Sequence, residues 1–146
     1  MKHLLCVVPI FAGLDDKALD IFLNHAKKMD FAQGDLIEKE GETNHCMYII
    51  AAGEVNIIKN FNAPNAVTLA KLGAGDFFGE MCILETLPRS ATGQAATAAT
   101  VISISSGAFY HLYEKRPDQH SILILNIARD LSRRLRRIDE AFAARH

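Results

Sequence analysis

Cysteine is scarce in this sequence, and its spacing excludes two structural classes. Only three of the 146 residues are cysteine, at Cys6, Cys46 and Cys82, and no two of them form a C-x-x-C pair. An odd number of widely separated cysteines provides neither a disulfide framework nor a thiolate zinc site. We therefore expect a protein of a reducing compartment, the cytoplasm.

An excess of charge of one sign is missing too, and so are long apolar runs. Sixteen Lys and Arg residues against seventeen Asp and Glu residues leave a formal net charge of −1, which gives no general reason to expect nucleic acid as a partner. No segment reaches the roughly eighteen apolar residues of a membrane span. The opening run "MKHLLCVVPIFAGL" begins like a signal peptide, but it contains Pro9 and continues directly into a helical pattern.

Patterns typical of metal and nucleophile catalysis are also absent. The six histidines, at positions 3, 25, 45, 111, 120 and 146, include no H-x-H pair and no H-E-x-x-H motif, which argues against a metalloenzyme of the cupin type. Neither a G-x-S-x-G elbow nor a Walker-type loop occurs. The sequence therefore predicts a non-catalytic protein with no metal site and no cofactor.

What is present predicts a single domain over residues 1–146, mainly β with flanking helices. The composition, 49% hydrophobic and 23% charged, is that of a globular chain able to bury a core. Residues 1–28 are expected to form an N-terminal helical segment, with Asp15 or Asp16 as a helix cap. In residues 29–105 short apolar runs alternate with glycines and an Asn-Ala-Pro-Asn turn, the pattern of an antiparallel sandwich or barrel.

Residues 106–146 are expected to form two C-terminal helices. The first stops near Pro117, and the second, over residues 119–146, has no internal proline or glycine. An apolar stripe with alternating spacing of three and four follows the second helix: Ala128, Leu131, Leu135, Ile138 and Phe142. Because so narrow a stripe is typical of a coiled-coil seam, we expect a homodimer through this helix. The alternative is that the stripe packs on its own domain.

Residues 78–92, "FGEMCILETLPRSAT", carry the candidate chemistry. Gly79 allows a tight turn and a close approach to a ligand, and the residues after it can form a short helix whose free N–H groups face an anion. Arg89 offers a planar fork for two phosphate oxygens, and Ser90 adds a hydroxyl group and an N–H group. A phosphate would repel Glu80, so we expect this carboxylate to accept from a ribose hydroxyl. The segment therefore predicts a cradle for a cyclic phosphodiester and its ribose.

This segment closely resembles the phosphate-binding cassette of the cyclic nucleotide-binding domain family, and the resemblance extends through "VPIFAGLDDKALDIFL" and "LGAGDFFGE" to nearly the whole chain. It implies a β-roll, a jelly-roll-like pair of antiparallel sheets, between an N-terminal helical segment and two C-terminal helices. It also implies that Arg89 holds the cyclic phosphate and Glu80 the ribose 2′-hydroxyl. The further ligand-binding residues that it implies are Gly79, Met81, Cys82, Ser90 and Ala91 through their backbone, and Leu69 and Leu72 near the base.

The sequence does not decide which purine base the ligand carries. The polar residues that bacterial activators of this family offer to adenine are missing from the last helix, where Ile138 could cover the base by apolar contact, or Arg134 or Arg137 could stack on it. Ser90 is compatible with cGMP, yet relatives that bind cAMP also carry serine at this place. We expect cAMP first and cGMP second.

The output of such a sensor is the part that the residues specify least. The sequence stops at His146, where bacterial activators continue into a helix-turn-helix domain. We therefore expect no direct DNA binding, and we expect the signal to pass to an unidentified protein partner. Two alternatives stay open: a degenerate β-roll used for oligomerisation or docking, and a sensor of a different effector such as another nucleotide or haem. Against the first, an arginine that faces an empty apolar roll would be a costly unpaired charge.

Overall fold

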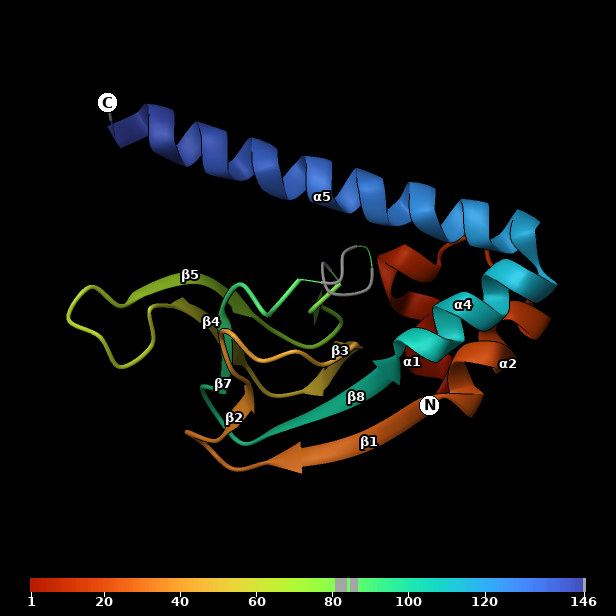
Figure 1. The fold of residues 1–146 in the computed structure, drawn as a ribbon, viewed down its shortest axis with the longest axis horizontal. Coiled ribbons are helices and arrows are strands. Elements are labelled where there is room, and N and C mark those ends of the chain that lie inside the picture. The colour runs from red at the N-terminus through yellow and green to blue at the C-terminus, as the bar shows by residue number, and fades with distance from the viewer. Residues whose placement is uncertain (81–83, 85–86, 146) are drawn as a thin grey trace.

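Two four-stranded antiparallel sheets with helices at one end make up the chain (Figure 1). The computed structural model describes residues 1–80, 84 and 87–145. The strand orders are β1-β8-β3-β6 in the first sheet and β2-β7-β4-β5 in the second. The elements are α1 (Lys2–Val7), η1 (Pro9–Phe11), α2 (Asp16–Asn24), β1 (Ala26–Phe31), β2 (Leu36–Glu38), β3 (Cys46–Ala52), β4 (Val55–Lys59), β5 (Val67–Leu72), β6 (Phe77–Phe78), β7 (Thr92–Ala95), β8 (Ala99–Ser105), α4 (Ser106–Lys115) and α5 (Pro117–Arg145). The predicted mainly β fold with flanking helices is confirmed.

Strand β3 is apolar throughout because both faces of its sheet are covered. Met47 and Ile49 pack in the cluster formed with the helices, whereas Tyr48 and Ile50 pack in a second cluster inside the roll. A strand that is buried on both faces has no need for polar residues at every second position. The first sheet therefore separates two cores.

The helices from the two ends of the chain pack together against the first sheet. The ring of Phe22 lies 4.9 Å from that of Phe11 and 5.1 Å from that of Phe109, measured between centroids. Leu123 and Ile127 of α5 are buried in the same cluster. Figure 1 shows α5 starting in this bundle and running on alongside the roll. The bundle therefore anchors the first part of α5, and the remainder extends over the roll.

Two element boundaries differ from those expected. Strand β1 begins at Ala26, inside the segment expected to be helical, because Ala26 pairs with Ile104 and the pairing continues along β8. Helix α5 begins at Pro117, two residues earlier than expected, since proline suits a first helical position where no N–H bond is lost.

Gly53 makes the tight turn from β3 to β4. Its φ is +86°, and a Cβ at this position would lie 2.3 Å from the backbone oxygen of Ala98. No other residue fits so close to another backbone. This turn sends β4 into the second sheet, where it forms part of a cavity wall.

The described residues form neither a metal-binding cluster nor a membrane-spanning helix. No three His, Cys, Asp or Glu side chains are grouped so as to hold a metal ion. None of the helices in the described part of the chain has the length and apolar character needed to cross a membrane.

Candidate ligand-binding site

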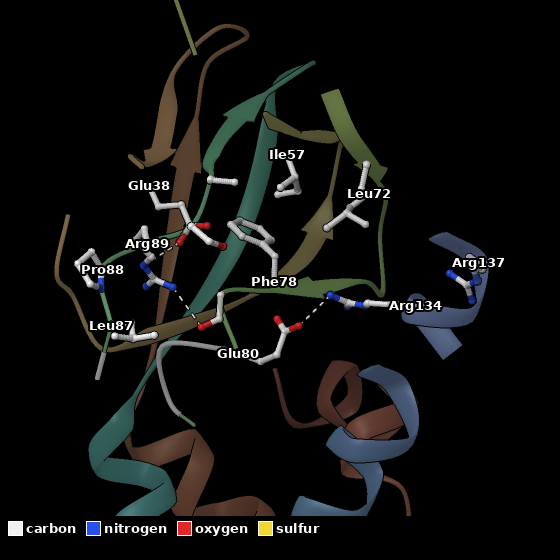
Figure 2. Close-up of a pocket in the computed structure, with 14 residues that line it drawn as sticks. Glu38, Ile57, Leu72, Phe78, Glu80, Leu87, Pro88, Arg89, Arg134 and Arg137 are labelled. Carbon is white, nitrogen blue, oxygen red and sulfur yellow. Dashed lines mark hydrogen bonds and ion pairs between the residues drawn. The ribbon is translucent and has the colours of Figure 1, made fainter. Parts of the chain in front are cut away.

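A cavity of about 250 Å³ lies between the second sheet, the end of β6 and helix α5 (Figure 2). This volume lies just below the roughly 300 to 1,000 Å³ that is typical of small-molecule sites. Apolar side chains of β4, β5 and β6 form one wall, and five charged side chains lie around the rest. The lining residues are Glu38, Ile57, Ala70, Leu72, Phe78, Gly79, Glu80, Leu87, Pro88, Arg89, Ser90, Ala91, Arg134 and Arg137.

Arg89 has an almost completely enclosed guanidinium group, with 3% of the residue exposed. Its Nη1 donates to the backbone oxygen of Gly79 at 3.1 Å, and its Nη2 donates to the backbone oxygen of Cys46 at 2.5 Å and to the side-chain oxygen of Asn44. The group also lies 5.5 Å from the centroid of the Tyr48 ring. These contacts fix its orientation at one end of the cavity.

Gly79 brings the backbone after β6 close to this guanidinium. Its φ is +84°, and a Cβ here would lie 2.6 Å from Nη1 of Arg89 and 3.1 Å from the backbone oxygen of Cys46. A side chain would therefore displace the arginine. The sequence predicts that Gly79 allows a ligand to approach, and in the structure it also makes room for Arg89.

Glu38 of β2 is the anion beside Arg89, and the sequence prediction does not include it. Its Oε2 lies 2.9 Å from Nε of Arg89, and 6% of the residue is exposed. Burial raises the pKa of Glu38 from 4.5 to about 7, although the charge of Arg89 acts in the opposite direction. A carboxyl group that titrates near neutral pH thus faces the guanidinium (Figure 2).

Glu80 connects the cavity to α5. It is 4% exposed, and its Oε1 accepts a hydrogen bond from Nη1 of Arg134 at 2.9 Å. Arg134 also donates to the backbone oxygen of Phe77 at 2.9 Å, pairs with Asp130 at 2.8 Å and lies 4.6 Å from the centroid of the Phe77 ring. Burial raises the pKa of Glu80, and the charge of Arg134 opposes this shift. The carboxylate therefore ties the end of β6 to the helix (Figure 2).

Most residues that the sequence predicts for the site lie around this cavity. Besides those described above, the lining includes Leu72, Ser90, Ala91 and Arg137. Ile138 is absent from the lining and is 64% exposed. Met81 and Cys82 lie outside the described residues.

Leu69 differs from its expected place, because the wall of the cavity is made by Ala70 and Leu72 instead. Successive side chains of a strand point to opposite faces, so Leu69 and Leu72, three positions apart, cannot both face inward in a regular strand. Leu69 is moreover the extra residue of a bulge, since Ile57 pairs with Ala70 while Ile58 pairs with Thr68. Its side chain is left exposed.

Some contributors to the site are missing from the sequence prediction. Glu38 and Asn44 contact Arg89, and Ile57, Ala70 and Phe78 belong to the cavity wall. The wall residues could have been found from strand alternation. No comparable signal marks Glu38, because the sequence does not show where β2 is bulged.

The arrangement suits a small ligand that carries an anionic group, a hydroxyl group and an apolar face. Three arginines and two glutamates line the cavity, so its charge is positive overall. Arg89 provides a fixed cation, Glu80 provides a hydrogen-bond acceptor, and the wall beside them is apolar.

Comparison with known proteins agrees with this geometry. The family model described as cyclic nucleotide-binding domain matches residues 28–116. The cyclic AMP receptor protein of Thermus thermophilus is 30% identical over 131 residues, which are 90% of this chain and 59% of that protein. A solved cyclic nucleotide-binding domain from Methylobacillus flagellatus superposes with a TM-score of 0.84 at 22% identity, over 99% of this chain and 81% of that one.

A second solved structure, the regulatory domain of Toxoplasma gondii PKA with cAMP, superposes with a TM-score of 0.77 at 24% identity, over 90% of this chain and 48% of that one. Both structural likenesses support the β-roll fold. The chain spans about three fifths of the length of the curated relatives that it matches first. The family match covers most of the chain, including Glu80 and Arg89, and the chain therefore belongs to the cyclic nucleotide-binding domain family.

Proposed function

We propose that this chain is a non-catalytic sensor of a cyclic nucleotide, cAMP first and cGMP second. The observation that carries the proposal is the buried Arg89 at one end of a small-molecule cavity that also contains the Glu80 carboxylate. The guanidinium suits the single charge of a cyclic phosphodiester, and the carboxylate suits a ribose 2′-hydroxyl donor. Cyclic AMP also appears in the names of the Thermus receptor and of the Toxoplasma domain.

In this proposal the base lies against α5. Arg134 is engaged with Glu80 and Phe77, which leaves Arg137, at the cavity rim, in the better position to stack on a purine. Ile138 is 64% exposed outside the lining, so it would cover the base only after the helix rotates. The apolar wall would contact the other face of the ligand.

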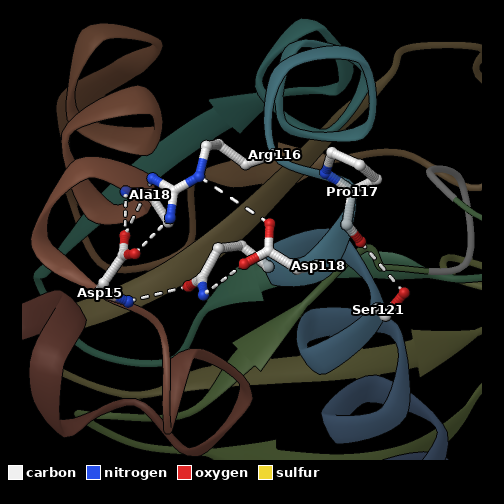
Figure 3. Close-up of polar contacts among 7 residues, drawn as sticks. Asp15, Ala18, Arg116, Pro117, Asp118 and Ser121 are labelled. Atoms are coloured by element: carbon white, nitrogen blue, oxygen red, sulfur yellow. Dashed lines mark hydrogen bonds and ion pairs between the residues drawn. The ribbon is translucent and has the colours of Figure 1, made fainter.

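The moving part would be α5, pivoting where it meets α4. Figure 3 shows that this junction is tied to the start of α2. The guanidinium of Arg116 pairs with Asp15, which caps α2 by accepting from the N–H group of Ala18 at 2.9 Å, and the N–H group of Asp15 donates to Gln119 at 2.9 Å. A change in the angle of α5 would therefore move the N-terminal helices as well. Ligand binding can shift this equilibrium by as much as the ligand prefers one position of α5 over the other.

We further propose that α5 pairs with a second copy of the chain and signals to a separate cytoplasmic protein. The apolar stripe of α5 is divided: Leu131 packs against the helical core of its own domain, whereas Leu135 and Ile138 are 58% and 64% exposed. The exposed part continues the spacing of a coiled-coil seam. Pairing of two such helices would cover it.

One observation favours a second candidate function, a docking module that binds no nucleotide. Glu38 gives Arg89 a counter-charge within the protein. A buried arginine with such a partner is not an unpaired charge, so its presence does not by itself require a ligand.

Calorimetric titration with cAMP, cGMP and the corresponding 5′-monophosphates separates the two functions. Arg89→Ala combined with Glu38→Gln removes the cation without leaving a buried anion unpaired, and Arg133→Ala changes an exposed arginine of α5 as a control. We expect the wild type and the control to bind a cyclic nucleotide, and the double variant to bind at least about 100-fold more weakly because a charge-assisted contact is lost. Absence of cyclic nucleotide binding by folded wild type would favour the docking module.

A further inference from the structure

The donors of Arg89 are already directed at acceptors within the protein. A guanidinium has five N–H donors. One donor of Nη1 is used by the backbone oxygen of Gly79, and Nη2 is used by the backbone oxygen of Cys46 and by Asn44. The remaining nitrogen, Nε, faces Glu38. A phosphate that takes two donors must therefore share the guanidinium with an acceptor that is already there.

Glu38 is the acceptor that a phosphate would displace most easily. Its Oε2 and the Nε of Arg89 lie 2.9 Å apart, yet both atoms are buried without a hydrogen bond. Charge rather than hydrogen-bond geometry holds this pair. The backbone oxygens of Gly79 and Cys46 are fixed by β6 and β3, whereas the Glu38 side chain carries the negative charge that a phosphate would repel.

The charged and titratable groups around Glu38 leave it with one favourable partner among the described residues. Arg89 favours its ionised form, while the carboxylates of Glu80 and Glu42 disfavour it. The hydroxyl group of Tyr48, on β3, is a further titratable group near Glu38 and Arg89. A bound phosphodiester would add another anion to this group, against the same single cation.

We propose that Glu38 competes with the ligand phosphate for Arg89, so that the site takes up a proton on Glu38 when it binds a phosphodiester and discriminates against phosphates with a second negative charge. The proposal rests on the proposed cyclic nucleotide function and assigns to Glu38 the charge selectivity of that site. Its geometric basis is the enclosed pair of one carboxylate and one guanidinium at the cavity end where a phosphate would bind.

Because phosphate binding is coupled to proton uptake by Glu38, the affinity for the ligand should depend on pH in a definite way. The pKa of Glu38 is about 7, and an anion placed beside it raises that pKa further. Well below pH 7 the carboxyl group is already neutral, so affinity does not change with pH. Above pH 7 binding requires a proton, so affinity falls by up to about tenfold per pH unit until the pKa of the bound form is passed. A 5′-monophosphate, whose second pKa is about 6, carries nearly two charges in this range and meets a larger repulsion.

The test is calorimetric titration of the whole chain with cAMP, cGMP and 5′-AMP at pH 6, 7 and 8, each in two buffers that differ in ionisation enthalpy. The variant Glu38→Gln keeps the size of the side chain and removes its charge. Glu40→Gln is the matched control, because Glu40 lies two positions along and pairs with Lys59 outside the cavity. The difference in heat between the buffers gives the number of protons taken up by the wild type without relying on any variant.

We expect wild type and Glu40→Gln to bind the better of the two cyclic nucleotides about fivefold more weakly at pH 8 than at pH 7, with uptake of close to one proton at pH 8. Glu38→Gln should show no proton uptake, an affinity constant within twofold from pH 6 to pH 8, and a gain at pH 8 that is larger for 5′-AMP than for the cyclic nucleotide. An unchanged pH dependence in Glu38→Gln would overturn the proposal, as would weaker binding by this variant at every pH. Failure of both the wild type and Glu38→Gln to bind any cyclic nucleotide at pH 6 would overturn the proposed function together with this inference.

Discussion

Replacing Glu38 with glutamine should change how the stability of the protein depends on pH, even without a ligand. In the folded chain the pKa of Glu38 is about 7, whereas its ordinary value is 4.5. The folded state therefore binds a proton more readily than the unfolded state, and the free energy of unfolding falls as pH rises from about 4.5 to about 7. A shift of about 2.5 pKa units corresponds to about 3 kcal/mol in total. Glutamine resembles the protonated carboxyl group and does not titrate, so the free energy of unfolding of the variant should not fall in this way as pH rises.

The assay is urea unfolding followed by circular dichroism at pH 5, 6, 7 and 8, for wild type, Glu38→Gln and Glu40→Gln. The quantity to compare is the difference between variant and wild type at each pH, because the effect of glutamine on packing is the same at every pH and cancels. For Glu38→Gln we expect this difference to move in favour of the variant by about 2 to 3 kcal/mol between pH 5 and pH 8. In thermal melts this corresponds to roughly 5 to 10 °C for a chain of this size. Parallel curves for wild type and Glu38→Gln would refute the reasoning that burial outweighs the charge of Arg89 and raises the pKa of Glu38.

Three further substitutions test the contacts around the cavity. Arg134→Ala removes the bonds from α5 to β6, so amide hydrogen exchange around that turn of α5 should become roughly tenfold faster, whereas the exposed Arg133→Ala should leave it unchanged. Gly79→Ala forces a side chain into a left-handed backbone and against the Arg89 guanidinium, so it should lower the free energy of unfolding by at least about 2 kcal/mol and abolish nucleotide binding. Ile138→Asp places a charge in the exposed stripe and should convert a dimer to a monomer in sedimentation velocity; an unchanged sedimentation coefficient would count against pairing through α5.

The sequence was most informative where function and local geometry use the same residues. Gly79, Glu80 and Arg89 occur together in one short motif, and the structure places all three at one cavity. The fold class could be predicted for a similar reason, since turn residues at regular intervals and uninterrupted apolar runs both follow from a roll with two covered faces.

Glu38 could not be predicted because a bulge interrupts the alternation of β2. Leu36 pairs with Gln94 and Glu38 pairs with Gly93, so two steps along β2 correspond to one step along β7. The extra residue changes which side chains point inward, and the sequence does not mark where such an insertion falls. Glu40, two positions farther on and equally acidic, lies at the surface with Lys59. The two glutamates look alike in the sequence, but Glu38 is the last residue of β2, whereas Glu40 lies past the end of the strand, in a turn.

The two ion pairs of the cavity should respond to a ligand in opposite ways. The pair of Glu38 and Arg89 shares its cation with a phosphate, so an anionic ligand weakens it. In the pair of Glu80 and Arg134 the bond to α5 uses Oε1, so a ribose hydroxyl that donates to the other oxygen leaves that bond in place. The hydroxyl also favours the ionised form of Glu80, whose pKa is otherwise raised by burial, and an ionised Glu80 holds Arg134 more strongly. We therefore expect the same ligand to loosen the contact of β2 with Arg89 and to tighten the contact of α5 with the roll. Ligand binding would then favour the position of α5 in which the helix lies against the roll.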